Sequence, residues 1–118
     1  MPPKELYTAE RDGDILILTP LINMSELEYS QTMTTEILAL FNDPTIKNLI
    51  LDFQKTDYFG STALGFFIRL YKMIKDHGGR MVLCNVSAHE TEILEVTKLS
   101  DYWTIHPTRE AALKAIKS

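Results

Sequence analysis

The most informative part of the chain is Leu49-Ile50-Leu51-Asp52-Phe53-Gln54-Lys55-Thr56-Asp57-Tyr58-Phe59-Gly60-Ser61-Thr62-Ala63-Leu64-Gly65. Its continuous apolar start is typical of a central strand that is covered on both faces. A short loop follows, and hydroxyl residues then open a long segment whose apolar residues have helical spacing. We therefore expect a buried strand, a loop, and a helix that begins near Ser61.

The start of this helix is a candidate modification site. Backbone N–H groups in the first turn of a helix have no partner within the helix, and the positive end of the helix dipole lies there. We expect the hydroxyl of Ser61 or Thr62 to cap the helix. The same position can hold a phosphate, so the pattern also indicates a phosphorylation switch.

The composition restricts the class of protein. The chain has 118 residues and 45% hydrophobic content, which predicts one globular domain over residues 1–118 with a sizeable core. The formal net charge of −4 argues against nucleic acid as the main partner, because binding to a phosphate backbone needs a basic face. Cys84 is the single cysteine and the three histidines are scattered, so we expect neither a disulfide nor a metal site.

The sequence also predicts where the protein works. The polar N-terminal residues 1–5 are unlike a signal peptide. The apolar runs are far too short to cross a bilayer. We therefore expect a soluble, cytoplasmic protein.

Apolar runs and turn signals alternate along the chain and predict its elements. The expected strands are a hairpin at 6–10 and 14–18 around Arg11-Asp12-Gly13, followed by 49–51, 81–84 and 102–105. The expected helices run from a capping box at Ser25 and Glu28 to Asn42-Asp43-Pro44, from Ser61 to His77 before Gly78-Gly79, from a capping box at Ser87 and Glu90 to about Thr97, and from Pro107-Thr108 onward. This alternation predicts an α/β fold in which about four helices pack on a mixed sheet that is parallel in its middle.

In the order and length of these elements the chain resembles the STAS domain, and in particular the bacterial anti-sigma factor antagonists. Asp52-Phe53-Gln54 takes the place of the family's Asp-Leu-Ser-type loop, and Gly60-Ser61-Thr62-Ala63-Leu64-Gly65 takes that of Asp-Ser-Ser-Gly-Leu-Gly. The segments 71–75 and 78–84 also fit the family. The resemblance implies that Ser61 is phosphorylated by a partner kinase that doubles as the anti-sigma factor, with Thr62 as the weaker candidate.

The chain departs from the family pattern near this position. Gly60 stands where the family usually has aspartate, Ala63 replaces a glycine, and Asn23 replaces a carboxylate that helps to shape the family's phosphorylation site. The loss of two acids lowers the local negative charge and makes a phosphate on Ser61 easier to tolerate. It also removes groups that a kinase could recognise.

The resemblance implies a non-enzymatic switch whose partner is an anti-sigma factor and serine kinase of the ATP-binding type. Such a chain needs no cofactor and no catalytic residue of its own, because the kinase supplies both. The partner-binding residues that we expect are Asn23, Met24, Phe59, Gly60, Ser61, Thr62 and Phe66. STAS domains also serve as accessory subunits of lipid-transport ATPases and of stress-signalling assemblies, so a binding module without phosphorylation is the alternative.

The chain lacks key residues of two other folds that bind or transfer phosphate. A nucleotide-binding phosphate loop needs Lys-Ser/Thr after its second glycine, whereas Phe66-Phe67 follows Gly65. A two-component receiver could use Asp52 as its acceptor. It also needs an acidic pair after its first strand and a lysine where this chain has His106.

The long helix has a wide apolar face. Its apolar residues cover an arc of roughly 200° at about 100° per residue, more than a helix on a sheet requires. Either neighbouring helices cover the excess, or Phe66, Leu70 or Met73 joins an exposed patch that binds a partner.

Overall fold

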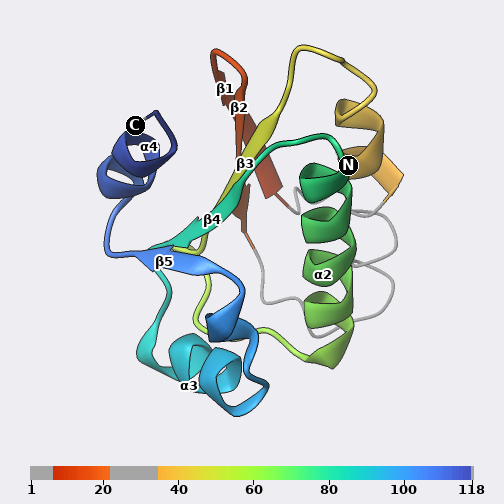
Figure 1. Cartoon of the computed structure of the whole chain (residues 1–118). Helices are drawn as coiled ribbons and strands as arrows, with labels where there is room; N and C mark the ends of the chain where they lie inside the picture. The colour runs from red at the N-terminus through yellow and green to blue at the C-terminus, as the bar shows by residue number, and fades with distance from the viewer. Residues whose placement is uncertain (1–6, 22–34, 118) are drawn as a thin grey trace, which may run out of the picture.

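The structure is a computed structural model that describes residues 7–21 and 35–117 and, for Ser61 and Thr62, the course of the backbone. Five strands form one sheet in the order β1-β2-β3-β4-β5. They are β1 (Tyr7–Asp12), β2 (Ile15–Pro20), β3 (Asn48–Asp52), β4 (Met81–Cys84) and β5 (Thr104–His106). β1 runs antiparallel to β2 and all other neighbours are parallel, so the predicted mixed sheet with an N-terminal hairpin is confirmed (Figure 1).

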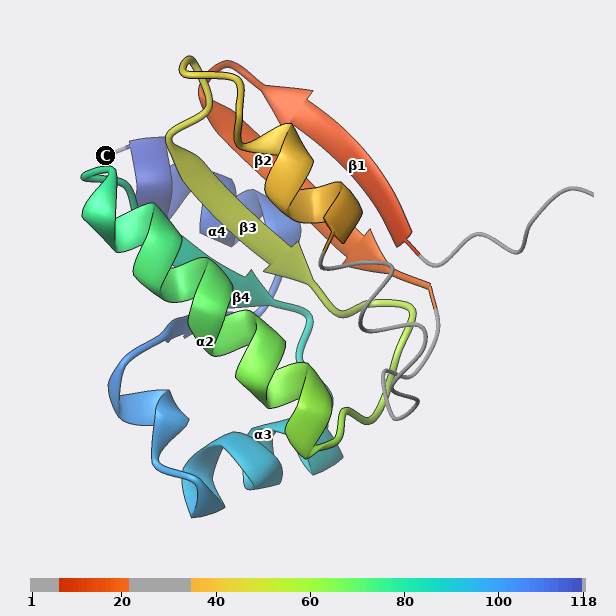
Figure 2. The same ribbon diagram turned by 90° about the vertical axis from the view of Figure 1, so that its right-hand side faces the viewer.

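The helices cover both faces of this sheet. Helical residues 35–40 and α2 (Ser61–Asp76) lie on one face, and α4 (Arg109–Lys117) lies on the other. α3 (Ala88–Val96) lies beyond the carboxyl ends of the parallel strands, beside the start of α2 (Figures 1 and 2). The loop between β3 and α2 therefore ends at the edge of the sheet where α3 also begins.

Side chains of the central strands alternate between two cores. Leu49 and Leu51 of β3 pack in the larger core with Phe67 of α2. Ile50 packs in the smaller core with Ile116 of α4. Strands buried on both faces have continuous apolar sequences, which is why the run at 49–51 predicts a central strand correctly.

The helix ends follow the local sequence signals. Ser87 Oγ accepts a hydrogen bond from the backbone N–H of Glu90 at 3.1 Å, and Glu90 Oε1 accepts one from the backbone N–H of Ser87 at 3.0 Å. The predicted capping box at the start of α3 is thus confirmed. Gly78 follows α2 with a φ of +77°, a conformation that glycine adopts without strain. The capping box expected at Ser25 and Glu28 lies outside the described residues.

The bounds of the hairpin and of the last strand differ from the sequence expectation. Asp12 pairs with Ile15, so the hairpin turn is Gly13-Asp14 rather than Arg11-Asp12-Gly13. Gly13 supplies the positive φ (+62°) that a two-residue hairpin turn needs. The last strand is 104–106 rather than 102–105. A short 3-10 helix, η1 (Leu99–Asp101), precedes it and turns Trp103 into the core.

Two glycines provide a matched test of this packing. A Cβ built on Gly79 would lie 1.8 Å from the carbonyl oxygen of Lys47, whereas one built on Gly65 meets nothing within 4 Å. Gly79→Ala should therefore lower the free energy of unfolding by about 1–3 kcal/mol. Gly65→Ala, inside α2, should raise it by about 0.5–1 kcal/mol. Urea unfolding of both variants measures the two changes, and equal effects of the same sign would contradict the packing described here.

Candidate functional site

The N-cap residue of α2 has no side chain. It is Gly60, in an extended conformation, and it makes no side-chain capping hydrogen bond. The backbone N–H of Leu64 donates to the carbonyl of Gly60 at 3.1 Å, which makes Ser61 and Thr62 the first two helical residues. The expectation that Ser61 or Thr62 occupies the N-cap position is therefore wrong. The cap position falls one residue earlier, on a residue without a side chain.

The first turn of α2 also carries no negative charge. It contains no acidic residue, whereas the first turns of α3 and α4 contain Glu90 and Glu110. The positive end of the α2 dipole is thus not offset by its own side chains. A helix end with these properties favours an anionic group, and Gly60 in place of the family's aspartate contributes to this.

Aromatic packing holds both ends of the β3–α2 loop. Phe53 and Phe59 are both buried, and each contacts Phe67 of α2. The three ring centroids lie 5.4–5.6 Å apart in edge-to-face arrangements, a geometry that adds to the apolar burial. Because Phe59 lies two residues before Ser61, this cluster fixes where the helix begins.

The start of α3 holds the middle of the same loop. Thr56 Oγ1 donates to Glu90 Oε2 at 3.0 Å, and Ser87 Oγ donates to the carbonyl of Asp57 at 3.0 Å. The rings of Tyr58 and His89 lie 5.4 Å apart. The capping box of α3 therefore has a second role, because the same Glu90 carboxylate that closes it also binds the loop.

Glu90 is fully buried in this position. Burial raises the pKa of Glu90, although hydrogen bonds from Ser87 and Thr56 oppose that effect. Desolvation disfavours the charged form of a carboxyl group. The burial of Glu90 therefore predicts that the stability of the contact between the loop and α3 depends on pH.

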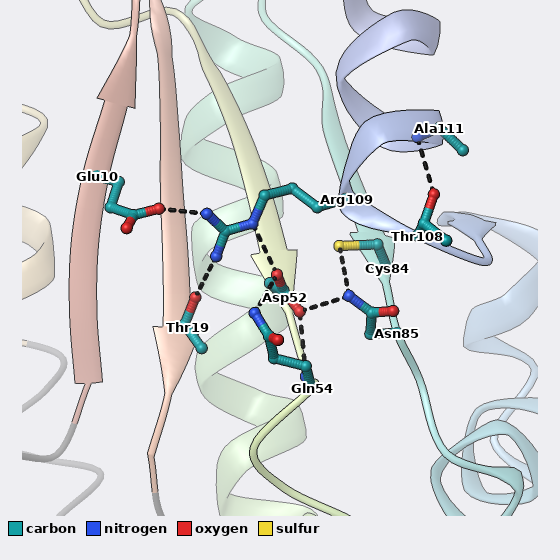
Figure 3. A network of polar contacts seen from close by, with 9 residues as sticks. All are labelled: Glu10, Thr19, Asp52, Gln54, Cys84, Asn85, Thr108, Arg109 and Ala111. Carbon is teal, nitrogen blue, oxygen red and sulfur yellow. Dashed lines mark hydrogen bonds and ion pairs between the residues drawn. The ribbon is translucent and has the colours of Figure 1, made fainter.

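A second buried carboxylate, Asp52, organises the end of β3 (Figure 3). Its Oδ1 accepts from the backbone N–H of Gln54 at 3.0 Å and from Asn85 Nδ2 at 2.9 Å. Its Oδ2 accepts from Gln54 Nε2 at 3.0 Å and from Arg109 Nε at 2.9 Å. Asp52 has no exposed surface, so its charge is matched inside the protein.

Arg109 extends this network to the hairpin. Its guanidinium donates to Thr19 Oγ1 at 3.1 Å and forms an ion pair with Glu10. Burial alone lowers the pKa of Arg109, but the hydrogen bonds with Asp52 and Glu10 outweigh this and hold it above its ordinary value. Beside them, burial and the charge of Asp52 raise the pKa of the Cys84 thiol to about 12. Cys84 is therefore a structural thiol rather than a nucleophile at neutral pH.

The structure places the predicted site residues in different environments. Phe59 and Phe66 are 2% and 4% exposed, and Leu70 is fully buried. The wide apolar arc of α2 is covered at Phe66 and Leu70, so these two side chains form no exposed patch. Asn23 and Met24 lie outside the described residues. Gly60, Ser61 and Thr62 come together with the loop at the helix start.

Asn85 and Arg109 help to hold this region, but neither was identified from the sequence. Asn85 adopts a positive φ of 55° after β4, which asparagine tolerates better than most residues. Arg109 lies 57 residues from Asp52 in the sequence, so no local spacing could predict their contact. An asparagine directly after a strand is the one hint that a local pattern offered.

Within residues 7–21 and 35–117, no group of three or more His, Cys, Asp or Glu side chains is arranged to hold a metal ion. No helix among the same residues has the length and apolar character needed to cross a membrane.

Comparison with known proteins gives consistent matches. The family model of the STAS domain matches residues 8–112. BtrV of Bordetella bronchiseptica, named an anti-sigma factor antagonist, is 28% identical over 81 residues, 69% of this chain and 70% of that protein. A Thermotoga maritima crystal structure with the same description has a TM-score of 0.88 at 19% identity over 95% of each chain. The Bacillus cell fate determinant SpoIIAA in phosphorylated form has a TM-score of 0.73 at 14% identity, over 93% of this chain and 98% of that chain.

Loss of the Arg109 charge should destabilise the fold. In Arg109→Met, the buried Asp52 carboxylate loses its ion pair, and we expect the free energy of unfolding to fall by about 2–3 kcal/mol. The matched control is Arg11→Met, which removes an ion pair with Asp43 in which both side chains are more than 40% exposed. That pair should contribute less than about 1 kcal/mol. Urea unfolding compares the two variants, and an equal loss in both would contradict the role of Asp52.

The raised pKa of Glu90 predicts a pH effect of definite sign. The folded chain binds a proton at Glu90 more tightly than the unfolded chain, whose glutamate has its ordinary pKa of 4.5. The contribution of Glu90 to stability is therefore largest below pH 4.5 and falls as the pH rises through the raised pKa. Glu90→Gln should gain stability relative to the unchanged protein as the pH increases. Unfolding curves at several pH values, with exposed Glu92→Gln as control, test this. A pH-independent difference would contradict it.

Proposed function

The chain belongs to the STAS domain family, and we propose that it acts as an anti-sigma factor antagonist that phosphorylation of Ser61 switches off. Its partner would be an anti-sigma factor that is also an ATP-binding serine kinase. The name of BtrV, which is 28% identical to this chain, supports the class of partner. The SpoIIAA structure in phosphorylated form supports the mode of regulation.

The observation that carries the proposal is the state of the α2 start. Ser61 is the first helical residue, no side chain caps the helix before it, and no acidic residue lies in its first turn. A phosphate at this position would meet free backbone N–H groups and the positive end of the dipole. The fold can therefore carry the modified residue without a buried unmatched charge.

The docking surface in this proposal surrounds the helix start. Phe59 and Phe66 are buried, so they would support that surface without contributing exposed side-chain area. The exposed residues of the neighbouring loop and of the first turn of α3 include Lys55, Asp57 and His89. Because hydrogen bonds and aromatic contacts hold the loop, the surface is formed before a partner arrives, which limits the ordering cost of binding.

The switch would act through charge. Phosphorylation adds about −1.5 to −2 charges at neutral pH. A charge that faces an interface must be desolvated there, and without a matching cation this opposes binding. The kinase supplies the phosphate donor and the catalytic base, so the proposed role needs no catalytic group from this chain.

Two substitutions at one position test the proposal. Ser61→Asp should weaken binding to the anti-sigma factor by more than about tenfold, since it places a charge in the interface, whereas Ser61→Ala should leave binding within about threefold. The partner is first identified by affinity capture and mass spectrometry, and titration calorimetry then gives the two affinities. Incubation with the captured kinase and ATP should modify Ser61 in the unchanged protein and nothing in Ser61→Ala.

Two other outcomes of these experiments would contradict the proposal in part or as a whole. Modification at Thr62 with Ser61 untouched would reject the assigned residue while keeping the switch. Equal affinities of the two variants, together with capture of a transport ATPase, would replace the proposal with an accessory binding module.

A further inference from the structure

A second face of α2 borders an apolar pocket away from the helix start. The pocket has a volume of about 310 Å³ and lies between α2 and the segment that joins η1 to β5. Ile68, Tyr71 and Lys75 contribute from α2, and Leu99, Tyr102 and Trp103 from the other side. Ile68 is seven residues beyond Ser61, about 10 Å along the helix. The pocket is therefore distinct from the surface proposed to bind the anti-sigma factor.

The wall of this pocket combines an apolar body with a cationic rim. Its charged members are Lys72 and Lys75, both exposed, and none of the described residues that line it is acidic. Lys75 Nζ lies 5.8 Å from the ring centroid of Tyr71, a contact that favours the ammonium group beside the aromatic wall. In a chain of net charge −4, these two lysines give the rim of the pocket a positive charge that is complementary to an anion.

Two further aromatic side chains line the pocket. Tyr102 is 67% exposed. Trp103 packs edge-to-face on Tyr71 at 6.3 Å. Its buried indole N–H has no hydrogen-bond acceptor among the described residues, whereas buried donors in proteins nearly always have one.

We propose that this pocket binds a monocarboxylate with an apolar chain, of the class of medium-chain fatty acids. The chain would lie against Ile68, Leu99 and the aromatic rings, and Lys72 and Lys75 would hold the carboxylate. The volume is at the lower end of the range of about 300–1,000 Å³ for small-molecule sites, which favours a short chain over a long one. Charge complementarity separates this ligand from an uncharged apolar molecule of the same size.

The test uses decanoate, below its micelle concentration, as the probe. Trp103 is the single tryptophan of the chain, so its fluorescence reports on the pocket wall directly. Decanoate should change that emission to saturation, and 1-decanol, which lacks the charge, should bind more weakly. Lys72→Gln and Lys75→Gln should each weaken decanoate binding by about twofold to fivefold, as expected for an exposed ion pair.

Lys47→Gln is the matched control, because it removes the same charge from an exposed residue that does not line this pocket. It should leave decanoate binding unchanged, and so should Ser61→Asp, which separates this proposal from the phosphorylation switch. Amide NMR shifts confined to the pocket residues would support the location. A lack of saturable binding, equal binding of 1-decanol, or unchanged affinity in both lysine variants would overturn the proposal.

Discussion

The buried carboxylate of Asp52 is the constraint on which the arrangement of the strand ends depends. A charge without exposed surface is tolerated only when it is paired and hydrogen-bonded. Asp52 meets this need through Gln54, Asn85 and Arg109, which come from the loop, the end of β4 and the first residue of α4. Satisfying one carboxylate therefore sets the turn into the loop, the backbone after β4 and the position of α4 over the sheet.

The elements of the fold could be predicted because their signals are local. The apolar run at 49–51 and the Ser87–Glu90 spacing each describe an environment within a few residues, and the structure contains both features. The boundaries were less accurate where a single residue decided them. The hairpin turn lies later than expected because Gly13 adopts a positive φ. The last strand begins later than expected because η1 precedes it. Neither effect follows from hydrophobic periodicity.

The start of α2 at Ser61 was predicted from the sequence, but the contacts that hold this region were not. Those contacts join residues that are far apart in the sequence. Thr56 and Glu90 are 34 residues apart, and Asp52 and Arg109 are 57 apart. The burial of Phe66 also depends on tertiary packing, because the width of an apolar arc does not show what covers it.

These contacts explain how α2 can begin at a defined residue although its N-cap residue has no side chain. A cap normally stabilises the first turn and defines where it begins. Here Phe59 packs against Phe67 just before the turn, and Glu90 holds the loop through Thr56. The helix start is thus positioned by the loop rather than by a hydroxyl in the turn itself. Because the N-cap residue is a glycine, the phosphorylation of Ser61 that we propose would not remove a side-chain cap from the N-cap position, and its main effect would be electrostatic.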